Sequence, residues 1–289
     1  MNKQSLPKCE AAPAPTAKPR RGMTLRRQFK RLAVLLVAAY VVLVLIAALL
    51  SDQLMFWPHA SSYGDSPEII KLTTADGVTI SALHLVDPTA TYTVLYSHGN
   101  GEDMGDLRDI YERICAAGFN VFAYDYHGYG TSGGSPTEAH AYADIDAAYE
   151  YLTTKLYVPP SRILVLGHSI GGGPSAELAA RKPVGGLILE STFVSAFRTP
   201  TRVALLPWDK FTNLAKLSSI HCPVLVIHGQ SDMIVPAWHG RQLYEAAPQP
   251  KQCFWVQKAG HNDLVDVAGQ QYSKALQDFA AMVDAGAGR

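Results

Sequence analysis

The segment from Leu32 to Leu50 contains no charged side chain. A helix of about 19 residues, rising ~1.5 Å per residue, spans roughly the hydrocarbon core of a bilayer. A helix is expected because every backbone polar group in lipid must be satisfied internally. Basic residues precede the segment at positions 26, 27, 30 and 31, whereas Ser51 and Asp52 follow it. The positive-inside rule therefore predicts a cytoplasmic N-terminus and an extracytoplasmic remainder, in a periplasm or a lumen.

Residues 1–31 are rich in Pro, Ala and basic side chains, so we predict a disordered basic tail there. A cleaved signal peptide is the alternative to a transmembrane helix over residues 32–50. The apolar run is longer than the usual signal core of about 7–15 residues. The stretch from Ala47 to Ser51 also lacks a clear small-x-small cleavage site. We therefore expect the helix to be kept as a membrane anchor.

The composition argues against two other classes of protein. The formal net charge is +0, so the basic face of a nucleic-acid binder is not expected and no nucleic-acid partner is predicted. Four cysteines are too few for a disulfide scaffold. A Cys222–Cys253 bridge stays open if their strands are neighbours, although small buried thiols are the commoner outcome. The composition does not indicate an oligomeric state.

From about residue 60, short runs rich in Val, Ile, Leu and Tyr alternate with longer stretches compatible with helices. Strands are expected at 68–73, 78–86, 92–97, 119–124, 162–167, 186–190, 223–228 and 252–256. Helices are expected at 103–117, 138–156, 171–181, 237–246 and 265–283. This alternation predicts a mostly parallel sheet with helices on both faces, in one α/β domain over residues 60–284. The continuously apolar runs 163–166 and 224–227 suit strands buried on both faces.

Residues 191–221 interrupt the alternation, because only a simple crossover is needed at that point. The interval is rich in apolar side chains and contains Pro200 and Pro207 as helix breakers. It is either core packing or an insertion over the functional edge of the sheet. We favour the second interpretation and expect a short cap.

Gly167-His168-Ser169-Ile170-Gly171 fits the Gly-x-Ser-x-Gly pattern of a nucleophile elbow. The pattern alone is a modest signal, but a strand-like run precedes it and a helix-compatible run follows it. Ser169 is therefore expected at a sharp strand-to-helix turn, where neighbouring chains approach closely and require small flanking residues. The helix that follows directs the positive end of its dipole at this position.

A serine hydroxyl needs a base to remove its proton, and the base needs an acidic group that orients it. With an elbow of this kind, the chain order is serine, then acid, then histidine. Asp232 follows the expected strand 223–228, and His261 follows the strand 252–256. Both therefore reach the same edge of the sheet as Ser169. His168 is a rival for the base, but its side chain is expected to point away into the sheet.

Ser97-His98-Gly99-Asn100-Gly101 follows the expected strand 92–97. In this architecture such a loop supplies one backbone N–H to an oxyanion hole, and the residue after the nucleophile supplies the other. We assign these donors to Asn100 and Ile170, with a glycine turn of no chemical role as the alternative. The loop 125–133 is expected to support the rim of the site. It lacks a phosphate-loop lysine, and no cluster of side chains there has metal-ligand spacing, so no metal or cofactor is predicted.

Together these motifs resemble the α/β-hydrolase-domain serine hydrolases, in the branch that contains animal protein depalmitoylases and their bacterial, fungal and plant relatives. The resemblance covers residues 65–280 and rests on Ser-His-Gly-Asn-Gly, Gly-His-Ser-Ile-Gly-Gly, His228-Gly229-x-x-Asp232 and Gly260-His261-Asn262-Asp263. It implies the α/β-hydrolase fold, a triad of Ser169, Asp232 and His261, and hydrolysis of an ester or thioester. The depalmitoylases resembled are tethered by lipidated N-terminal cysteines. Here only Cys9 is available, and a hydrophobic span takes the place of that tether.

We therefore expect a membrane-anchored serine hydrolase that cleaves acyl esters or thioesters through an acyl-serine intermediate. The apolar interval 191–221 favours an acyl chain, or another lipid-like group, in the substrate. An aminopeptidase-like activity is the enzymatic alternative, because the same triad cleaves peptides. A catalytically inactive binding module on a membrane anchor is the alternative from another class.

Overall fold

The computed structural model describes residues 25–199 and 201–287, and it divides into two units between Ala48 and Leu49. Helix α1 (Leu25–Met55) is the one described helix that is long and apolar enough to cross a membrane, with a mean hydropathy of 3.1 in its most apolar window. It contains the whole predicted span 32–50. Residues 25–31, which we expected in the disordered tail, are helical, and residues 1–24 of that tail lie outside the described residues.

The second unit is built on a sheet of eight strands in the order β1-β2-β4-β3-β5-β6-β7-β8. The six strands from β3 to β8 pair in parallel, whereas β2 is antiparallel to both β1 and β4. Each strand lies within about two residues of a predicted strand. Their bounds are β1 (Ile69–Thr73), β2 (Thr79–Leu85), β3 (Thr93–Ser97), β4 (Asn120–Tyr124), β5 (Ile163–His168), β6 (Gly186–Glu190), β7 (Val224–Gly229) and β8 (Lys251–Val256).

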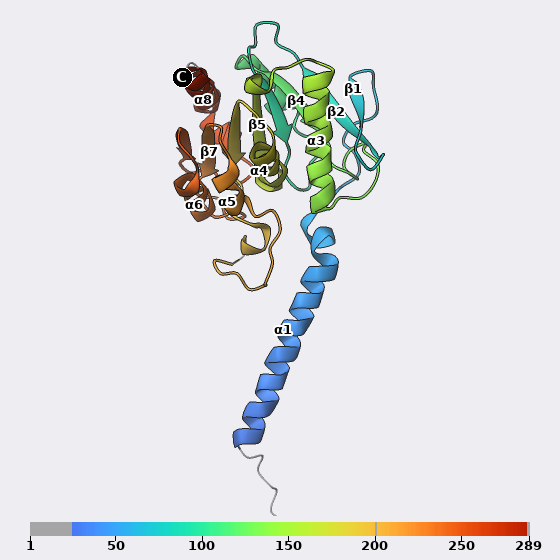
Figure 1. The fold of residues 1–289 in the computed structure, drawn as a ribbon, viewed down its shortest axis with the longest axis vertical. Coiled ribbons are helices and arrows are strands. Elements are labelled where there is room, and N and C mark those ends of the chain that lie inside the picture. The colour runs from blue at the N-terminus through green and yellow to red at the C-terminus, as the bar shows by residue number, and fades with distance from the viewer. Residues whose placement is uncertain (1–24, 200, 288–289) are drawn as a thin grey trace, which may run out of the picture. The chain divides into compact units, whose positions relative to one another are not determined.

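Helices cover both faces of the sheet, as predicted, and each face has its own buried core. The first core includes side chains from α3 (Glu138–Thr154), α4 (Gly172–Arg181) and α6 (Trp238–Ala246). Figure 1 shows α3 and α4 in front of the sheet. The second core includes side chains from α2 (Arg108–Ala116), α7 (Leu264–Ala268) and α8 (Gln270–Ala287). Strands β3, β5, β6 and β7 are buried along their whole length, which explains their apolar sequences.

Two predicted helices differ from the observed ones. The helix expected from residue 103 begins only at Arg108, because the Asp103 carboxylate accepts the N–H groups of Gly105 and Asp106 and holds a turn. The helix expected over 265–283 is divided into α7 and α8 at Gly269, where the backbone turns to a φ of 52°. Such a φ is unfavourable for residues other than glycine and ends the first helix.

The interval 191–221 contains little regular structure, namely the short helix α5 (Asn213–Lys216) and the single 3-10 turns η3 (Ala196–Arg198) and η4 (Leu217–Ser219). Phe193 and Phe211 belong to the first core, whereas Val203 and Leu205 are 61% and 52% exposed. The ends of the interval therefore pack into the domain and its middle presents apolar side chains to the outside. Cys222 and Cys253 are both free thiols.

Candidate active site

Ser169 lies where the central strand β5 turns sharply into helix α4, through the 3-10 turn η2 (Ser169–Gly171). Its backbone φ is 53°, in the left-handed region that a serine rarely adopts. The turn is possible because its neighbours lack side chains. A Cβ on Gly171 would overlap the carbonyl oxygen of Ser97, and one on Gly172 would overlap Thr192. The Thr192 hydroxyl also donates to the Ser169 carbonyl over 2.6 Å, which helps to hold the strained turn in place.

The structure brings the three predicted side chains of the triad together. Nε2 of His261 lies 2.9 Å from the Ser169 hydroxyl oxygen, and its Nδ1 lies 2.7 Å from Oδ2 of Asp232. All three residues are buried, with 4% to 9% of their surface exposed. The serine–base and base–acid distances lie within the range in which a hydroxyl, an imidazole and a carboxylate exchange or share protons.

The acidic group of this arrangement is held as a carboxylate. Its second oxygen accepts the N–H groups of Ile234 and Val235 over 2.9 and 2.8 Å. Burial alone would raise the pKa of Asp232, but the hydrogen bond and charge of His261, with the Val235 N–H, lower it below its ordinary value. Asp232 therefore carries its charge beside the imidazole at neutral pH. Asp263, two residues after His261, accepts the Gly260 N–H and orients the loop rather than the ring.

The two residues assigned to the oxyanion hole follow the neighbouring parallel strands β3 and β5. Ile170 is the chain neighbour of Ser169, and Asn100 lies in the loop after β3. The preceding N–H in that loop, that of Gly99, already donates to Glu102 over 2.6 Å. The Asn100 side chain makes hydrogen bonds of its own, to Met55 and Trp57. Sequence reasoning assigned a role only to its backbone and missed these contacts, because no local pattern pairs residues more than 40 positions apart.

The orientation predicted for His168 is wrong. Its ring lies beside that of His261, with the ring centroids 5.3 Å apart, and its Nδ1 lies 3.0 Å from Oε1 of Glu190. Burial alone would lower the pKa of His168, but the hydrogen bond to Glu190 and the negative charge of Glu102 raise it. Glu190 ends strand β6, next to β5, and adjacent parallel strands end at one edge of the sheet. The position of Glu190 at the carboxyl end of a predicted strand is therefore the sequence signal that could have placed it at the site.

The loop 125–133 contacts the residues that follow β3 through Asp125, Tyr126 and Tyr129. The Tyr129 hydroxyl donates to Oδ1 of Asn100 over 2.7 Å, and Oδ1 of Asp125 accepts the Met104 N–H over 2.9 Å. These contacts agree with the predicted supporting role at the rim. Elsewhere in the described residues, His59, Asp103 and Asp106 bring three potential metal ligands within 4.8 Å of one another. The Asp103 carboxylate is engaged by Ser62 and by backbone N–H groups, which accounts for that cluster as a loop structure.

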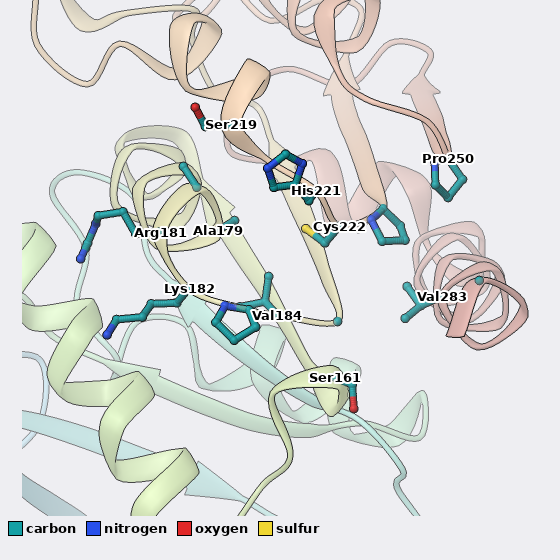
Figure 2. Close-up of a pocket in the computed structure, with 15 residues that line it drawn as sticks. Ser161, Ala179, Arg181, Lys182, Val184, Ser219, His221, Cys222, Pro250 and Val283 are labelled. Carbon is teal, nitrogen blue, oxygen red and sulfur yellow. The ribbon is translucent and has the colours of Figure 1, made fainter. Parts of the chain in front are cut away.

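A pocket of about 620 Å³ lies at the edge of the sheet where parallel strands begin (Figure 2). It is lined by residues that precede parallel strands, among them Ser161, His221, Cys222 and Pro250. Because Ser169, Asp232 and His261 all follow the carboxyl ends of strands, this pocket is remote from them. A smaller cavity of about 60 Å³ touches the triad at His261, and His168 and Glu190 line it among others.

The strand order, and a serine at the turn after the central strand β5, are those of the α/β-hydrolase fold, and the protein is a serine hydrolase of that class. The family model described as serine aminopeptidase, S33, matches residues 88–215. The chain belongs to the family of α/β-hydrolase domain-containing 17 proteins. It is 39% identical to protein 17B of Xenopus laevis over 229 residues, covering 78% of this chain and 79% of that protein. The human 17B protein is 38% identical over the same length and coverage.

Solved structures support the same fold. The esterase Pf2001 of Pyrococcus furiosus superimposes with a TM-score of 0.67 at 20% identity, over 79% of this chain and 97% of the esterase. The esterase domain of a Rhodothermus marinus protein superimposes with a TM-score of 0.58 at 19% identity, over 73% of this chain and 96% of that domain. At these identities the likeness concerns the fold. The resemblance drawn from the sequence motifs is confirmed by the identity to the 17B proteins.

Proposed function

We propose that this serine hydrolase cleaves carboxylic esters or thioesters of an acyl substrate through an acyl-serine intermediate. The observation that carries the proposal is the unbroken path from the Ser169 hydroxyl to Nε2 of His261, 2.9 Å away, and from its Nδ1 to Asp232, 2.7 Å away. The Ser169 oxygen attacks the substrate carbonyl carbon while His261 accepts the hydroxyl proton. The bond to the alcohol or thiol then breaks, and His261 returns the proton to that leaving group. Water, activated by His261, attacks the acyl-serine and releases the acid.

Backbone donors stabilise the oxyanion that forms at each attack. We assign this role to the N–H groups of Asn100 and Ile170, because the Gly99 N–H is already bound to Glu102. Donors held by the fold need no reorganisation during the reaction. The negative charge of Asp232 favours the imidazolium form of His261 that exists while the proton is in transit.

The apolar surroundings of the site favour an acyl or other lipid-like substrate. Met233, directly after Asp232, is 89% exposed, and Ile234 is 57% exposed. Val203 and Leu205, in the middle of the interval 191–221, are exposed as well. A contiguous patch of exposed apolar side chains marks a surface that binds apolar partners, and we propose that these four side chains contribute to one. We propose that residues 191–221 act as a cap that contacts the acyl group.

We further propose that helix α1 anchors the enzyme in a membrane through residues 32–50, with the N-terminus in the cytoplasm. The charge asymmetry around the apolar run supports this orientation. The catalytic domain, residues 60–284, then faces a periplasm or a lumen. Its substrates are acyl esters or thioesters on that side, which separates it from depalmitoylases that act on cytoplasmic palmitoyl-proteins.

An activity-based probe tests the nucleophile. A fluorophosphonate is expected to label the full-length protein and to lose all labelling in Ser169→Ala, because the probe reacts only with an activated serine. Ser219→Ala, which removes an exposed hydroxyl at the opposite edge of the sheet, is the matched control and keeps full labelling. A folded wild-type protein that resists the probe would instead support an inactive binding module.

A panel of acyl esters, acyl thioesters and peptide amides tests the bond that is cleaved. We expect Ser169-dependent turnover of esters or thioesters, with kcat/KM rising with acyl length. The match to the serine aminopeptidase family model favours peptide cleavage as the second candidate function. A clear preference for N-terminal peptide amides over every acyl ester would replace our first proposal with that one.

A further inference from the structure

Residues 52–57, here called the exit segment, lead from the last turn of α1 into the catalytic domain. They belong to the same unit as the active site, which begins at Leu49. A segment that merely links an anchor to a domain is expected to run over the surface with few contacts. The exit segment instead contacts several of the loops that surround the triad.

The most direct contacts join the exit segment to the predicted oxyanion loop. The Asn100 side-chain amide donates to the carbonyl oxygen of Met55 over 2.7 Å. Its Oδ1 accepts the Trp57 N–H over 2.8 Å and the Tyr129 hydroxyl over 2.7 Å. The Trp57 N–H also lies 3.0 Å from the Tyr129 hydroxyl oxygen. One side chain thus closes a small network between the exit segment, the oxyanion loop and the rim loop 125–133.

Packing and charge fasten the exit segment on its other side. Phe56 is 4% exposed, and its ring meets those of Tyr129 and Phe211 edge to face, with centroids 6.5 and 6.0 Å apart. The Asp52 carboxylate forms an ion pair with Lys210 and accepts the N–H of Glu138 at the start of α3. The segment is therefore held both by the cap interval and by the first turn of a core helix.

We propose that the exit segment is part of the active-site scaffold, and that the Asn100 side chain is a positioning residue that holds the Asn100 N–H in place for the oxyanion. This inference rests on the proposed acyl-serine mechanism and deepens it. The loop before Asn100 is fixed by the Gly99 N–H bond to Glu102 and by the Tyr126 hydroxyl, which donates to the His98 carbonyl. At Asn100 itself the loop is restrained by the network with Met55, Trp57 and Tyr129, and four residues further on the Met104 N–H donates to Asp125. The exit segment and the oxyanion donor are therefore coupled mechanically.

An oxyanion donor stabilises the transition state only when it is held at the correct position. Removing one donor typically lowers kcat by about 10²–10³-fold, and a misplacement of about 1 Å in a reacting geometry can cost about 10²-fold. The substrate in its ground state does not need this donor, so its binding is largely unaffected. A change in the Asn100 side chain should therefore lower kcat rather than raise KM.

The test uses the full-length protein and three variants. Asn100→Ala removes the whole network but leaves the backbone N–H in the chain. Tyr129→Phe removes one hydroxyl from it and keeps the ring against Phe56. Asn120→Ala is the matched control, because its Oδ1 accepts the Asp87 N–H over 2.9 Å in a comparable loop tie away from the triad.

We expect Asn100→Ala to lower kcat by about 10–100-fold with KM changed less than about threefold, consistent with a misplaced donor. The affinity for an acyl trifluoromethyl ketone, which forms an oxyanion on the serine, should fall by the same factor as kcat/KM. Tyr129→Phe should show the same pattern to a smaller extent, and Asn120→Ala should match wild type. If Asn100→Ala fails to fold, as judged by its thermal melting temperature, Tyr129→Phe alone carries the test.

An unchanged kcat in the folded Asn100→Ala protein, or a ketone affinity that does not follow kcat/KM, would overturn the inference. An equal loss of kcat in Asn120→Ala would also overturn it, because that loss would indicate a general effect on stability. If the proposed acyl-serine mechanism is itself wrong, the wild-type protein will show no Ser169-dependent labelling or turnover. That result is distinguishable from a failure of the role proposed for Asn100.

Discussion

Ser169 adopts its unfavourable backbone conformation because the surrounding residues leave no alternative. The chain must leave a fully buried parallel strand and enter helix α4 within the three residues of η2. The left-handed φ of 53° directs the hydroxyl out of the sheet toward His261. A strained residue of this kind costs roughly 1–3 kcal/mol and persists only when its surroundings determine it. The glycines on either side are the residues that permit the turn.

Gly171→Ala is expected to destabilise the fold and to disturb the site. The added Cβ would overlap the Ser97 carbonyl oxygen, which belongs to the backbone and cannot move aside cheaply. Overpacking of this kind costs about 1–3 kcal/mol, so the thermal melting temperature should drop by several degrees. Gly64→Ala is the control, because a Cβ there meets no atom within 4 Å. Equal melting temperatures for the two variants would contradict this account of the turn.

At the scale of elements, the irregular segment after β6 is held to the domain by a few specific contacts rather than by regular structure. The Val194 N–H donates to Nδ1 of His239, at the start of α6, over 3.2 Å. The Asn213 amide donates to the Phe193 carbonyl over 3.1 Å. His239 is fully buried and stacked on Trp238, with centroids 3.6 Å apart. Because Nδ1 accepts a hydrogen bond, the ring is neutral when the segment is in place.

The stability of the protein should therefore fall in mild acid through His239. Burial, with the positive charge of Arg198 nearby, lowers the pKa of His239 from 6.5 to about 4. Between these pH values the unfolded chain binds one more proton than the folded chain, so stability is lost as pH falls from 6.5 toward 4 and is retained above 6.5. Melting temperatures of wild type and His239→Gln between pH 7.5 and 4.5 measure the effect.

In His239→Gln the amide oxygen can still accept the Val194 N–H, but the titrating group is gone. We therefore expect a shallower decline in melting temperature below pH 6.5 than in wild type. Carboxylates elsewhere in the protein titrate in both proteins, so the difference between the two curves reports on His239. Parallel curves for the two proteins would rule out this residue as a source of acid sensitivity.

At the scale of the whole molecule, the distribution of charge along the chain differs between its two ends. Basic residues precede a charge-free apolar segment, and an α/β domain follows it. The formal net charge of the chain is zero, so the orientation that we propose in a membrane rests on the local bias at positions 26–31 rather than on the total charge. This orientation decides which acyl substrates the enzyme can meet.

Reporter fusions after Arg289 test the predicted orientation. Alkaline phosphatase, which folds only in an oxidising compartment, is expected to be active at this position, and a reporter restricted to the cytoplasm is expected to be inactive. The control changes the basic residues at 26, 27, 30 and 31 to Gln and adds Lys residues after position 58, which should reverse both signals. Activity of the cytoplasmic reporter in the unmodified fusion would move the catalytic domain to the other side.

Most of the sheet could be predicted from the sequence, because buried parallel strands require continuous apolar runs and the loops between them carry glycine and polar residues. All eight predicted strands are present, including the antiparallel β2 beside β1. The prediction of one continuous helix over 265–283 was wrong, because a single glycine inside an apolar pattern does not reveal its φ. The predicted start of α2 was wrong because Asp103, whose carboxylate holds the preceding turn, is equally compatible with the first turn of a helix.

The sequence by itself determined the elements that depend on neighbouring residues: the apolar helix, the alternating strands and helices, the elbow around Ser169, and the order in which Asp232 and His261 follow it. The catalytic roles of Ser169, Asp232 and His261 stay a prediction, which the fluorophosphonate experiment tests. Only the tertiary structure decided that His168 faces His261 beside Glu190, and that the Asn100 side chain joins the exit segment to the oxyanion loop. Such pairs lie from 22 to 93 positions apart, and their contact depends on the order and register of strands, which no local pattern of side chains contains.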